Sequence, residues 1–288
     1  MYIVFSEKCL EYWEPGHPES PDRVYRTYKL LEKMNFHFIE AEPCDEEDLL
    51  LVHSKKFVEK IKSELFHDPD TPNLPGIYEY ARLAAGSAIK SMELALNGEN
   101  AFSLMRPPGH HAGVNGRALG APTLGFCYFN NIAIACMKAL QKVDRIAILD
   151  IDCHHGNGTQ EIFFKNPRVL FVSLHRCGVY PGTGWRSEEN CLNYPFLHAV
   201  GEQEYLNTLE KALGEIEKFN PDLLAVSVGF DTYKYDPVCS LGLSVKSYMG
   251  IGRSIAELGK KMFAVLEGGY GKAFPQCVLN FLNGLKET

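Results

Sequence analysis

The sequence lacks the features of membrane-spanning, secreted and nucleic-acid-binding proteins. It has no apolar run long enough to span a membrane, and its first ten residues show no basic stretch followed by an apolar one. We therefore expect a cytoplasmic protein that makes no contact with a membrane. Lys and Arg are scattered and the net charge is −7, which argues against nucleic acid as a partner.

The nine cysteines include no CxxC pair. An odd number of widely spaced cysteines suits neither a disulfide framework nor a thiolate zinc site, so we expect reduced and mostly buried thiols. Cys153 stands between Asp152 and His154. In an extended strand its side chain would point away from both neighbours, which favours a packing role over a chemical one.

What is present is the composition of an ordinary globular protein, with 45% hydrophobic and 23% charged residues. No linker, internal repeat or low-complexity segment divides the chain, so we expect residues 1–288 to form a single domain. Short apolar runs rich in β-branched residues alternate with longer amphipathic stretches. This alternation indicates an α/β fold of three layers, in which helices cover both faces of a mainly parallel sheet.

The two kinds of segment give specific predictions. We expect strands at Tyr2–Phe5, Ala101–Met105, Ile146–Ile151, Val169–Leu174, Leu223–Val228 and Met262–Leu266. We expect helices at Ile77–Leu96, Ile132–Gln141, Glu204–Phe219 and Val245–Leu258.

Four of the predicted strands are followed by sequences with reactive side chains. These are "RPPGHHAG" at 106–113, "DCHHGNG" at 152–158, "GFD" at 229–231 and "EGGYG" at 267–271. In open parallel sheets, ligand sites form beyond the carboxyl ends of the strands. All four ends would lie at one edge of the sheet, so we expect these side chains to meet there.

Acidic side chains interrupt the most apolar strand, where an unpaired charge is costly. Asp150, Asp152 and His154 alternate and would project from one side of an extended chain. With Asp231 from another strand end, Asp152 and His154 make a set of three oxygen and nitrogen donors. Three protein ligands and a position open to water are typical of catalytic zinc, and Fe²⁺ accepts the same donors. A divalent cation also explains the buried acids, because it keeps carboxylates ionised.

The remaining polar groups suit amide hydrolysis at such a metal. Asp150 can orient a histidine of the "GHH" loop, and His110 and His111 can take a proton from water and return it to a leaving group. The Tyr270 hydroxyl, on a Gly-Gly turn, can donate to a developing oxyanion. A polar loop would explain the histidine pair alone, and a helix cap would explain Asp231 alone. Together such explanations need several coincidences at corresponding strand ends.

Eight motifs resemble those of the histone deacetylase superfamily, which includes class I and II deacetylases, acetoin-utilisation proteins and acetylpolyamine amidohydrolases. They occur in family order and read HPESPDR (17–23), RPPGHHA (106–112), GFCYFNN (125–131), DIDCHHGNG (150–158), VSLH (172–175), YPGTG (180–184), GFD (229–231) and LEGGYG (266–271). The resemblance implies the arginase/deacetylase fold. It also implies zinc-dependent removal of acetyl or short acyl groups from acyl-lysine in proteins or peptides.

The resemblance implies roles for several polar residues of these motifs. Its zinc ligands are Asp152, His154 and Asp231. A structural K⁺ or Na⁺ ion nearby would be bound by the side chains of Asp150 and Ser173 and by main-chain carbonyls of Asp150, Asp152, His154 and Leu174. A second, more distant cation would use the carbonyls of Phe163, Asn166 and Val169.

The same resemblance assigns the proton transfers. It pairs His110 with Asp150, makes His111 the general base and then the acid, and lets Tyr270 polarise the acetyl oxygen. The second histidine is backed by Asp in class I and by Asn in class II. Asn157 stands at this place, so the chain resembles class II, and a neutral partner should leave His111 less basic than an aspartate would.

The resemblance also outlines a tunnel for the acyl-lysine side chain. Gly125, Phe126 and Tyr180 would wall it, because flat aromatic rings suit an aliphatic stem that carries no charge after acetylation. Asp70 matches an acid at the rim that holds substrate backbone amides. Arg23 matches an arginine that lines an internal exit for acetate.

Val238 is where the chain departs from the polyamine-specific branch of the family. That branch has an acid seven residues after the third metal ligand, and valine offers no attraction for a second ammonium group. The chain is also short for the family, which disfavours histones as substrates. An acetylpolyamine or other small-molecule deacetylase stays the alternative, followed by a non-catalytic module that binds acyl-lysine. Arginase chemistry needs a second set of metal ligands, which these motifs lack.

Overall fold

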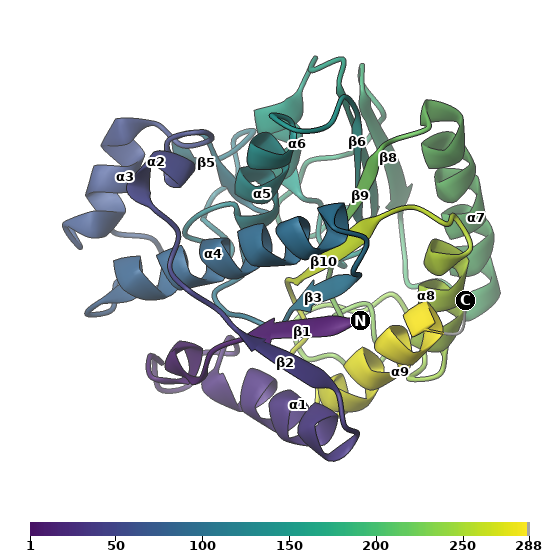
Figure 1. Cartoon of the computed structure of the whole chain (residues 1–288), viewed down its shortest axis with the longest axis horizontal. Coiled ribbons are helices and arrows are strands. Elements are labelled where there is room, and N and C mark those ends of the chain that lie inside the picture. Colours follow the sequence, from purple (N-terminus) through teal and green to yellow (C-terminus); the bar gives the residue numbers. More distant parts are fainter. Residues whose placement is uncertain (287–288) are drawn as a thin grey trace.

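Apolar β-branched runs form the central sheet of the computed structural model, which describes residues 1–286 (Figure 1). Eight parallel strands lie in the order β2-β1-β3-β10-β9-β6-β7-β8. They are β1 (Tyr2–Phe5), β2 (His37–Glu40), β3 (Ala101–Ser103), β6 (Ile146–Asp150), β7 (Val169–Arg176), β8 (Cys191–Phe196), β9 (Leu223–Val228) and β10 (Met262–Leu266). A separate antiparallel pair consists of β4 (Ala112–Gly113) and β5 (Gly116–Arg117).

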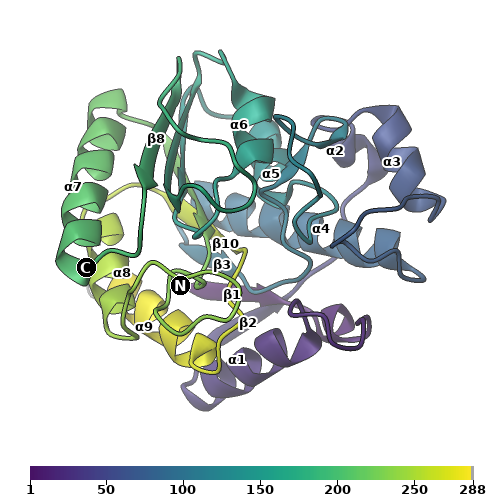
Figure 2. The same ribbon diagram turned by 180° about the vertical axis from the view of Figure 1, so that it is seen from behind.

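Helices cover both faces of the sheet, as the apolar strands predict (Figure 2). One face carries α1 (Pro21–Lys33), α7 (Glu202–Phe219), α8 (Ser247–Ala256) and α9 (Phe274–Lys286). The other carries α2 (Glu46–Leu49), α3 (Lys55–Lys62), α4 (Ile77–Leu96), α5 (Asn131–Ala139) and α6 (Asn157–Phe163). A short 3₁₀ helix, η1, spans Glu7–Leu10.

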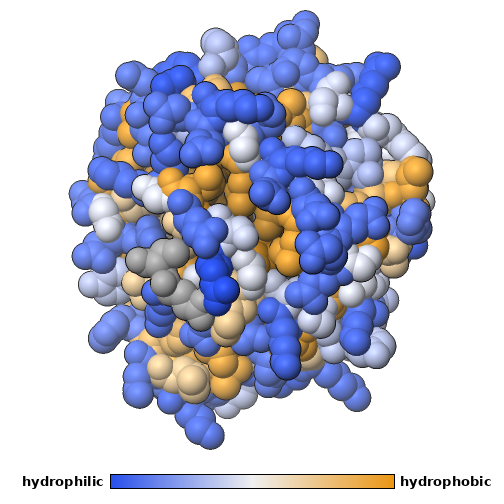
Figure 3. All heavy atoms as spheres, turned by 90° about the vertical axis from the view of Figure 1, so that its right-hand side faces the viewer, coloured by the Kyte–Doolittle hydropathy of each residue, from blue (hydrophilic) through white to orange (hydrophobic). Residues whose placement is uncertain are grey.

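The alternation along β6 shows how the two cores arise. Ala147 and Leu149 pack with α7, whereas Ile146 and Ile148 pack with α4 and α5 on the opposite face. Hydrophilic side chains dominate the outer surface of α7, α8 and α9, with smaller apolar areas between them (Figure 3). Among residues 1–286, no helix is both long and apolar enough to cross a membrane.

The predicted elements exist, with differences at their ends. The bounds of β1, β9, β10 and α4 are as predicted, whereas β3 and β6 end earlier, at Ser103 and Asp150, where the chain leaves the sheet. The edge strands β2 and β8 and helices α1, α2, α3, α6 and α9 were not predicted. Strand β8 contains Asn193 and Pro195, residues that weaken a strand pattern and that an edge position tolerates.

A buried ion pair ties the N-terminal segment to the chain that follows β3. Arg106 is fully buried, and its Nε and Nη2 donate to the Glu19 carboxylate at 2.8 and 2.7 Å. Its Nη1 also donates to the Cys9 and Tyr12 carbonyls. Burial alone would raise the pKa of Glu19, but Arg106 lowers it to about 2. This pair anchors the start of the "RPPGHH" segment.

We expect Glu19→Ala to lower the free energy of unfolding by about 3–5 kcal/mol, because it leaves the Arg106 charge buried without its partner. Urea denaturation measures this change. The control is Glu32→Ala, which removes the exposed partner of Lys29 and should have a far smaller effect. Similar small effects of both substitutions would contradict the prediction.

Candidate active site

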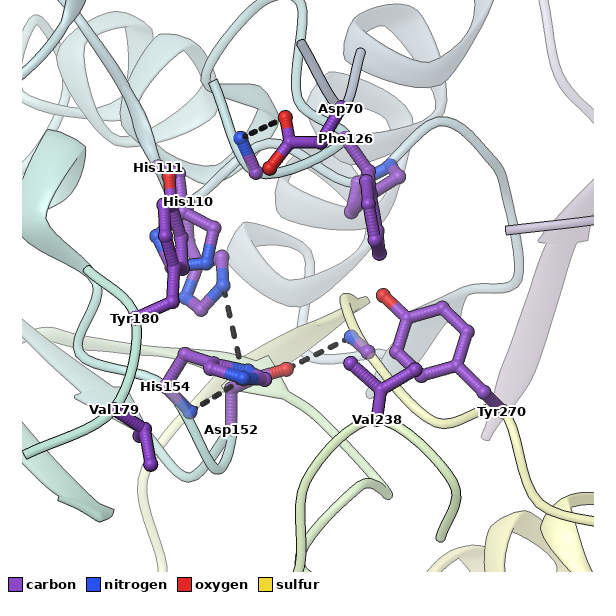
Figure 4. Close-up of a pocket in the computed structure, with 13 residues that line it drawn as sticks. Asp70, His110, His111, Phe126, Asp152, His154, Val179, Tyr180, Val238 and Tyr270 are labelled. Atoms are coloured by element: carbon purple, nitrogen blue, oxygen red, sulfur yellow. Dashed lines mark hydrogen bonds and ion pairs between the residues drawn. The ribbon is translucent and has the colours of Figure 1, made fainter. Parts of the chain in front are cut away.

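The prediction that four strand ends meet at one edge of the sheet is confirmed. Asp150, the last residue of β6, is aligned with Ser173 on β7 and Ser227 on β9, and β10 follows β9 in the same parallel register. The segments after β3, β6, β9 and β10 therefore surround one cavity of about 280 Å³ (Figure 4). Its wall includes His110, Asp152 and Tyr270.

The expected geometry of the acidic strand was wrong in one respect. Strand β6 ends at Asp150, so Asp152 and His154 lie on a turn rather than on one side of an extended chain. Side-chain acceptors bend the backbone there, because Asp152 N donates to Asp150 Oδ1 and His154 N donates to Asp152 Oδ1. Cys153 is fully buried in the apolar core, and its backbone N–H donates to Asp231 Oδ1.

Asp152, His154 and Asp231 place their donor atoms within 4.8 Å of one another. His154 Nδ1 lies 2.8 Å from Asp231 Oδ2 and 3.1 Å from Asp152 Oδ1. Asp231 Oδ2 is buried and has no hydrogen-bond partner in residues 1–286, so its contact with His154 is close without hydrogen-bond geometry. Burial and the Asp152 carboxylate raise the pKa of Asp231 to about 8. Two carboxylate oxygens and an imidazole nitrogen that converge in this way fit a divalent cation.

His110 is held by a buried carboxylate. Its Nδ1 contacts Asp150 Oδ2 at 2.9 Å, and its Nε2 lies 3.8 Å from Asp152 Oδ1. Burial alone would lower the pKa of His110, but the charges of Asp150 and Asp152 raise it to about 10. The Asp150 carboxylate therefore favours the protonated form of this ring.

His111 is held by a neutral amide instead of a carboxylate. The Asn157 amide nitrogen donates to the Ala118 carbonyl at 2.9 Å, which directs Asn157 Oδ1 towards His111 Nδ1, 2.7 Å away. Since an amide oxygen only accepts, Nδ1 carries the proton and Nε2 of the neutral ring is free to take one. Burial, followed by the neighbouring His110 and His154, lowers the pKa of His111 well below its usual value.

Tyr270 directs its hydroxyl into the cavity from the turn after β10 (Figure 4). Arg23 lies behind the ring, with Cζ 4.5 Å from its centroid, and is not among the residues that line the cavity. Its guanidinium donates to the Gly269 and Glu267 carbonyls at 2.6 and 2.7 Å. The structure thus places Arg23 as a support for the tyrosine turn, adjacent to the cavity rather than along its wall.

Phe126 and Tyr180 form aromatic walls on different sides of the cavity (Figure 4). Gly125 and Phe126 both have left-handed backbones, with φ of 58° and 68°. Their N–H groups donate to Asp70 Oδ1 and Thr71 Oγ1, and Asp70 Oδ2 accepts from Thr123. Both oxygens of Asp70, the predicted rim acid, are therefore engaged within the protein. Val238 lies at the mouth, 38% exposed.

Glu267 is a buried site residue that the sequence patterns missed. Its Oε2 accepts from the backbone N–H groups of Gly109 and His110 at 2.7 and 3.2 Å, and its Oε1 accepts from Ser227 Oγ at 3.0 Å. It therefore holds the "GHH" loop against β9 and β10. The sequence signal for Glu267 is an acid that directly follows the apolar strand β10, three residues before Tyr270.

The predicted first cation site has donors that fit a monovalent ion. Asp150 and Ser173 are neighbours on paired strands. His175 Nε2 faces the Gly184 carbonyl, so its Nδ1 is the acceptor and the Ser173 hydroxyl donates to it at 2.8 Å. Burial lowers the pKa of His175 to about 4, which keeps the ring neutral. The lone pairs of Ser173 Oγ stay free for a cation.

The predicted second cation site does not fit an ion. The carbonyls of Phe163, Asn166 and Val169 all accept from the side-chain amide of Asn190, at 2.8, 3.3 and 2.9 Å. The orientation of this amide is fixed, because Asn190 Oδ1 accepts from the backbone N–H of Lys165 at 2.7 Å. A neutral donor thus occupies the place where the resemblance puts a cation.

Known proteins share both the sequence pattern and the fold. Residues 17–285 match the family model for the histone deacetylase domain. The chain is 37% identical over 307 residues to a histone deacetylase-like amidohydrolase of Pseudomonas aeruginosa, covering 95% of this chain and 78% of that protein. It superimposes on the crystal structure of the HDA15 HD domain with a TM-score of 0.89 and 31% identity, covering 100% and 91% of the two chains. It also superimposes on an acetylpolyamine aminohydrolase of Burkholderia pseudomallei with a TM-score of 0.86 and 26% identity. That match covers 100% of this chain and 99% of the other.

Removing the Asn190 amide should create a cation site. We expect crystals of Asn190→Ala soaked in a Tl⁺ salt to gain one anomalous peak among the Phe163, Asn166 and Val169 carbonyls. The control is Asn280→Ala, whose amide donates to the Val245 carbonyl and should gain none. A Tl⁺ peak at the three carbonyls of the unaltered protein would show that Asn190 does not exclude the ion.

Proposed function

The chain belongs to the histone deacetylase family, and on that premise we propose that it is a zinc-dependent amidohydrolase that removes acetyl or short acyl groups from acyl-lysine in proteins or peptides. The observation that carries this proposal is the convergence of Asp152, His154 and Asp231 in a cavity that also holds a neutral histidine and a tyrosine hydroxyl. The buried Asp231 Oδ2, which lacks a hydrogen-bond partner among the described residues, supports a metal at this place.

Asp152, His154 and Asp231 would hold the ion, and their donor atoms suit Zn²⁺ or Fe²⁺. When bound, such an ion acts as a Lewis acid that lowers the pKa of water and polarises a carbonyl. The proposed K⁺ or Na⁺ ion beside Asp150 and Ser173 would offset part of the negative charge of the buried acids.

Three side chains would carry the proton transfers and the transition-state charge. His111 Nε2 would take a proton from the attacking water and then return it to the leaving amine. His110, held by Asp150, would keep a positive charge beside the reacting centre. The Tyr270 hydroxyl would donate to the oxyanion that develops on the acyl carbonyl.

The lining of the cavity favours an acylated lysine over a polyamine. Phe126 and Tyr180 would contact the aliphatic stem, and Val179 and Val238 add apolar surface. A second ammonium group would find no free carboxylate, because the oxygens of Asp70 already accept hydrogen bonds from within the protein. The similarity to an acetylpolyamine aminohydrolase keeps a small acylated amine as the alternative substrate.

A panel of acylated amines on zinc-loaded protein tests this function. We expect kcat/KM for acetyl-lysine peptides to exceed that for N-acetylputrescine by about tenfold or more, since an apolar mouth gives no compensation for a second charge. Released acetate is the readout. A preference for the polyamine would favour the alternative, and binding of acetyl-lysine without acetate release would favour a non-catalytic module. As control, Asp231→Ala should lose both metal and turnover, and full activity would remove Asp231 from the ligand set.

Asn157→Asp should move the acidic limb of the kcat/KM profile to higher pH by roughly one unit. A carboxylate next to Nδ1 favours the protonated form of His111 and raises its pKa. The general base works only when unprotonated, so a raised pKa requires a higher pH for the same rate. An unchanged limb, or a shift to lower pH, would show that a group other than His111 sets this limb.

A further inference from the structure

The turn that carries Tyr270 has little intrinsic rigidity. Gly268 and Gly269 precede the tyrosine and Gly271 follows it, and Gly269 has a φ of 117° that other residues rarely adopt. Such a turn samples many backbone conformations unless its polar groups are bound. A hydroxyl that must meet a developing charge needs a fixed backbone beneath it.

Two carboxylates bind N–H groups of this turn. Asp152 Oδ2 accepts from Gly268 N at 2.8 Å, and Asp236 binds the N–H groups of Tyr270 and Gly271. Asp236 Oδ2 accepts from Tyr270 N at 2.6 Å and from Gly271 N at 2.9 Å. Its other oxygen, Oδ1, accepts from Val238 N at 2.9 Å and Cys239 N at 3.3 Å. Asp236 therefore bridges the tyrosine turn and the segment at the mouth of the cavity, and Tyr270 and Val238 both line that cavity (Figure 4).

The two ends of the turn are held in complementary ways. Arg23 donates to the carbonyls of Glu267 and Gly269. Asp236 accepts from the N–H groups of Tyr270 and Gly271. Hydrogen bonds to a charged group are stronger than those between neutral groups, so the Asp236 contacts can fix a backbone that its glycines leave free.

We propose that Asp236 is a positioning residue that sets the placement of the Tyr270 hydroxyl by clamping the tyrosine turn to the Val238 segment. Asp236 does not line the cavity and takes no direct part in the reaction. The inference rests on the proposed function for the role of Tyr270, whereas the clamp itself rests on the four hydrogen bonds.

Asp236→Asn keeps the size of the side chain but replaces one acceptor oxygen with an NH₂ group that faces two N–H donors. We expect kcat for an acetyl-lysine peptide to fall by about tenfold to a hundredfold, with KM changed by less than about twofold, because a displaced donor affects the transition state most. In a Tyr270→Phe background, Asp236→Asn should change kcat by less than about twofold. Metal content should stay unchanged in all variants.

The matched control is Asp222→Asn. Asp222 Oδ2 also accepts from two backbone N–H groups, those of Asp144 and Arg145, at the opposite end of β9 from the cavity. Its replacement should leave kcat unchanged. A general weakening of the fold would lower the activity of both variants alike, whereas loss of the clamp lowers it only for Asp236→Asn.

The inference is overturned if Asp236→Asn lowers kcat equally with and without the Tyr270 hydroxyl, or if it causes loss of metal. Neither result affects the proposed function. Absence of acetate release by the unaltered protein would instead overturn the proposed function. The clamp then has its own readout, the ¹⁹F signal of 3-fluorotyrosine at position 270. Asp236→Asn should shift or split this signal and Asp222→Asn should not, and an unaltered signal in both would overturn the clamp.

Discussion

The candidate site depends on the cost of burying several carboxylates in one place. Asp150, Asp152 and Asp231 are each at most 1% exposed, and an unpaired charge at such depth is strongly unfavourable. The protein meets this cost with imidazoles, backbone N–H groups and a set of converging lone pairs that suits a cation. The loops that carry these imidazoles and N–H groups therefore have to lie against the buried carboxylates.

Buried or half-buried acids hold three of the loops at the carboxyl edge of the sheet. Glu267 accepts from the loop that carries the two histidines, Asp70 accepts from the loop of Phe126, and Asp236 accepts from the tyrosine turn. All three loops contain glycine, whose free backbone has to be fixed by an external acceptor. The sheet and the bound acids together fix the backbone of these glycine-containing loops, and with it the positions of the side chains that line the cavity.

The sequence patterns predicted the parts of the molecule that depend on local periodicity and parallel topology. The apolar strands β6, β9 and β10 were recognisable, and the meeting of their ends followed from the rule for parallel sheets. The turn at Asp152 was not recognisable, because it depends on side-chain acceptors that interrupt the strand. Glu267, Asp236 and Asn190 were missed because each also binds backbone groups that are distant in sequence, and such contacts leave no periodic signal.

Gly125 limits how this cavity can diversify. A β-carbon at this position would lie 2.5 Å from His111 Cδ2 and 2.7 Å from the Tyr180 hydroxyl, and the backbone there is already left-handed. Any larger residue would therefore push against the His111 and Tyr180 rings at once. Val238 at the mouth is 38% exposed, so a larger or more polar side chain fits there without displacing its neighbours, and a variant library gains more by randomising Val238 than Gly125.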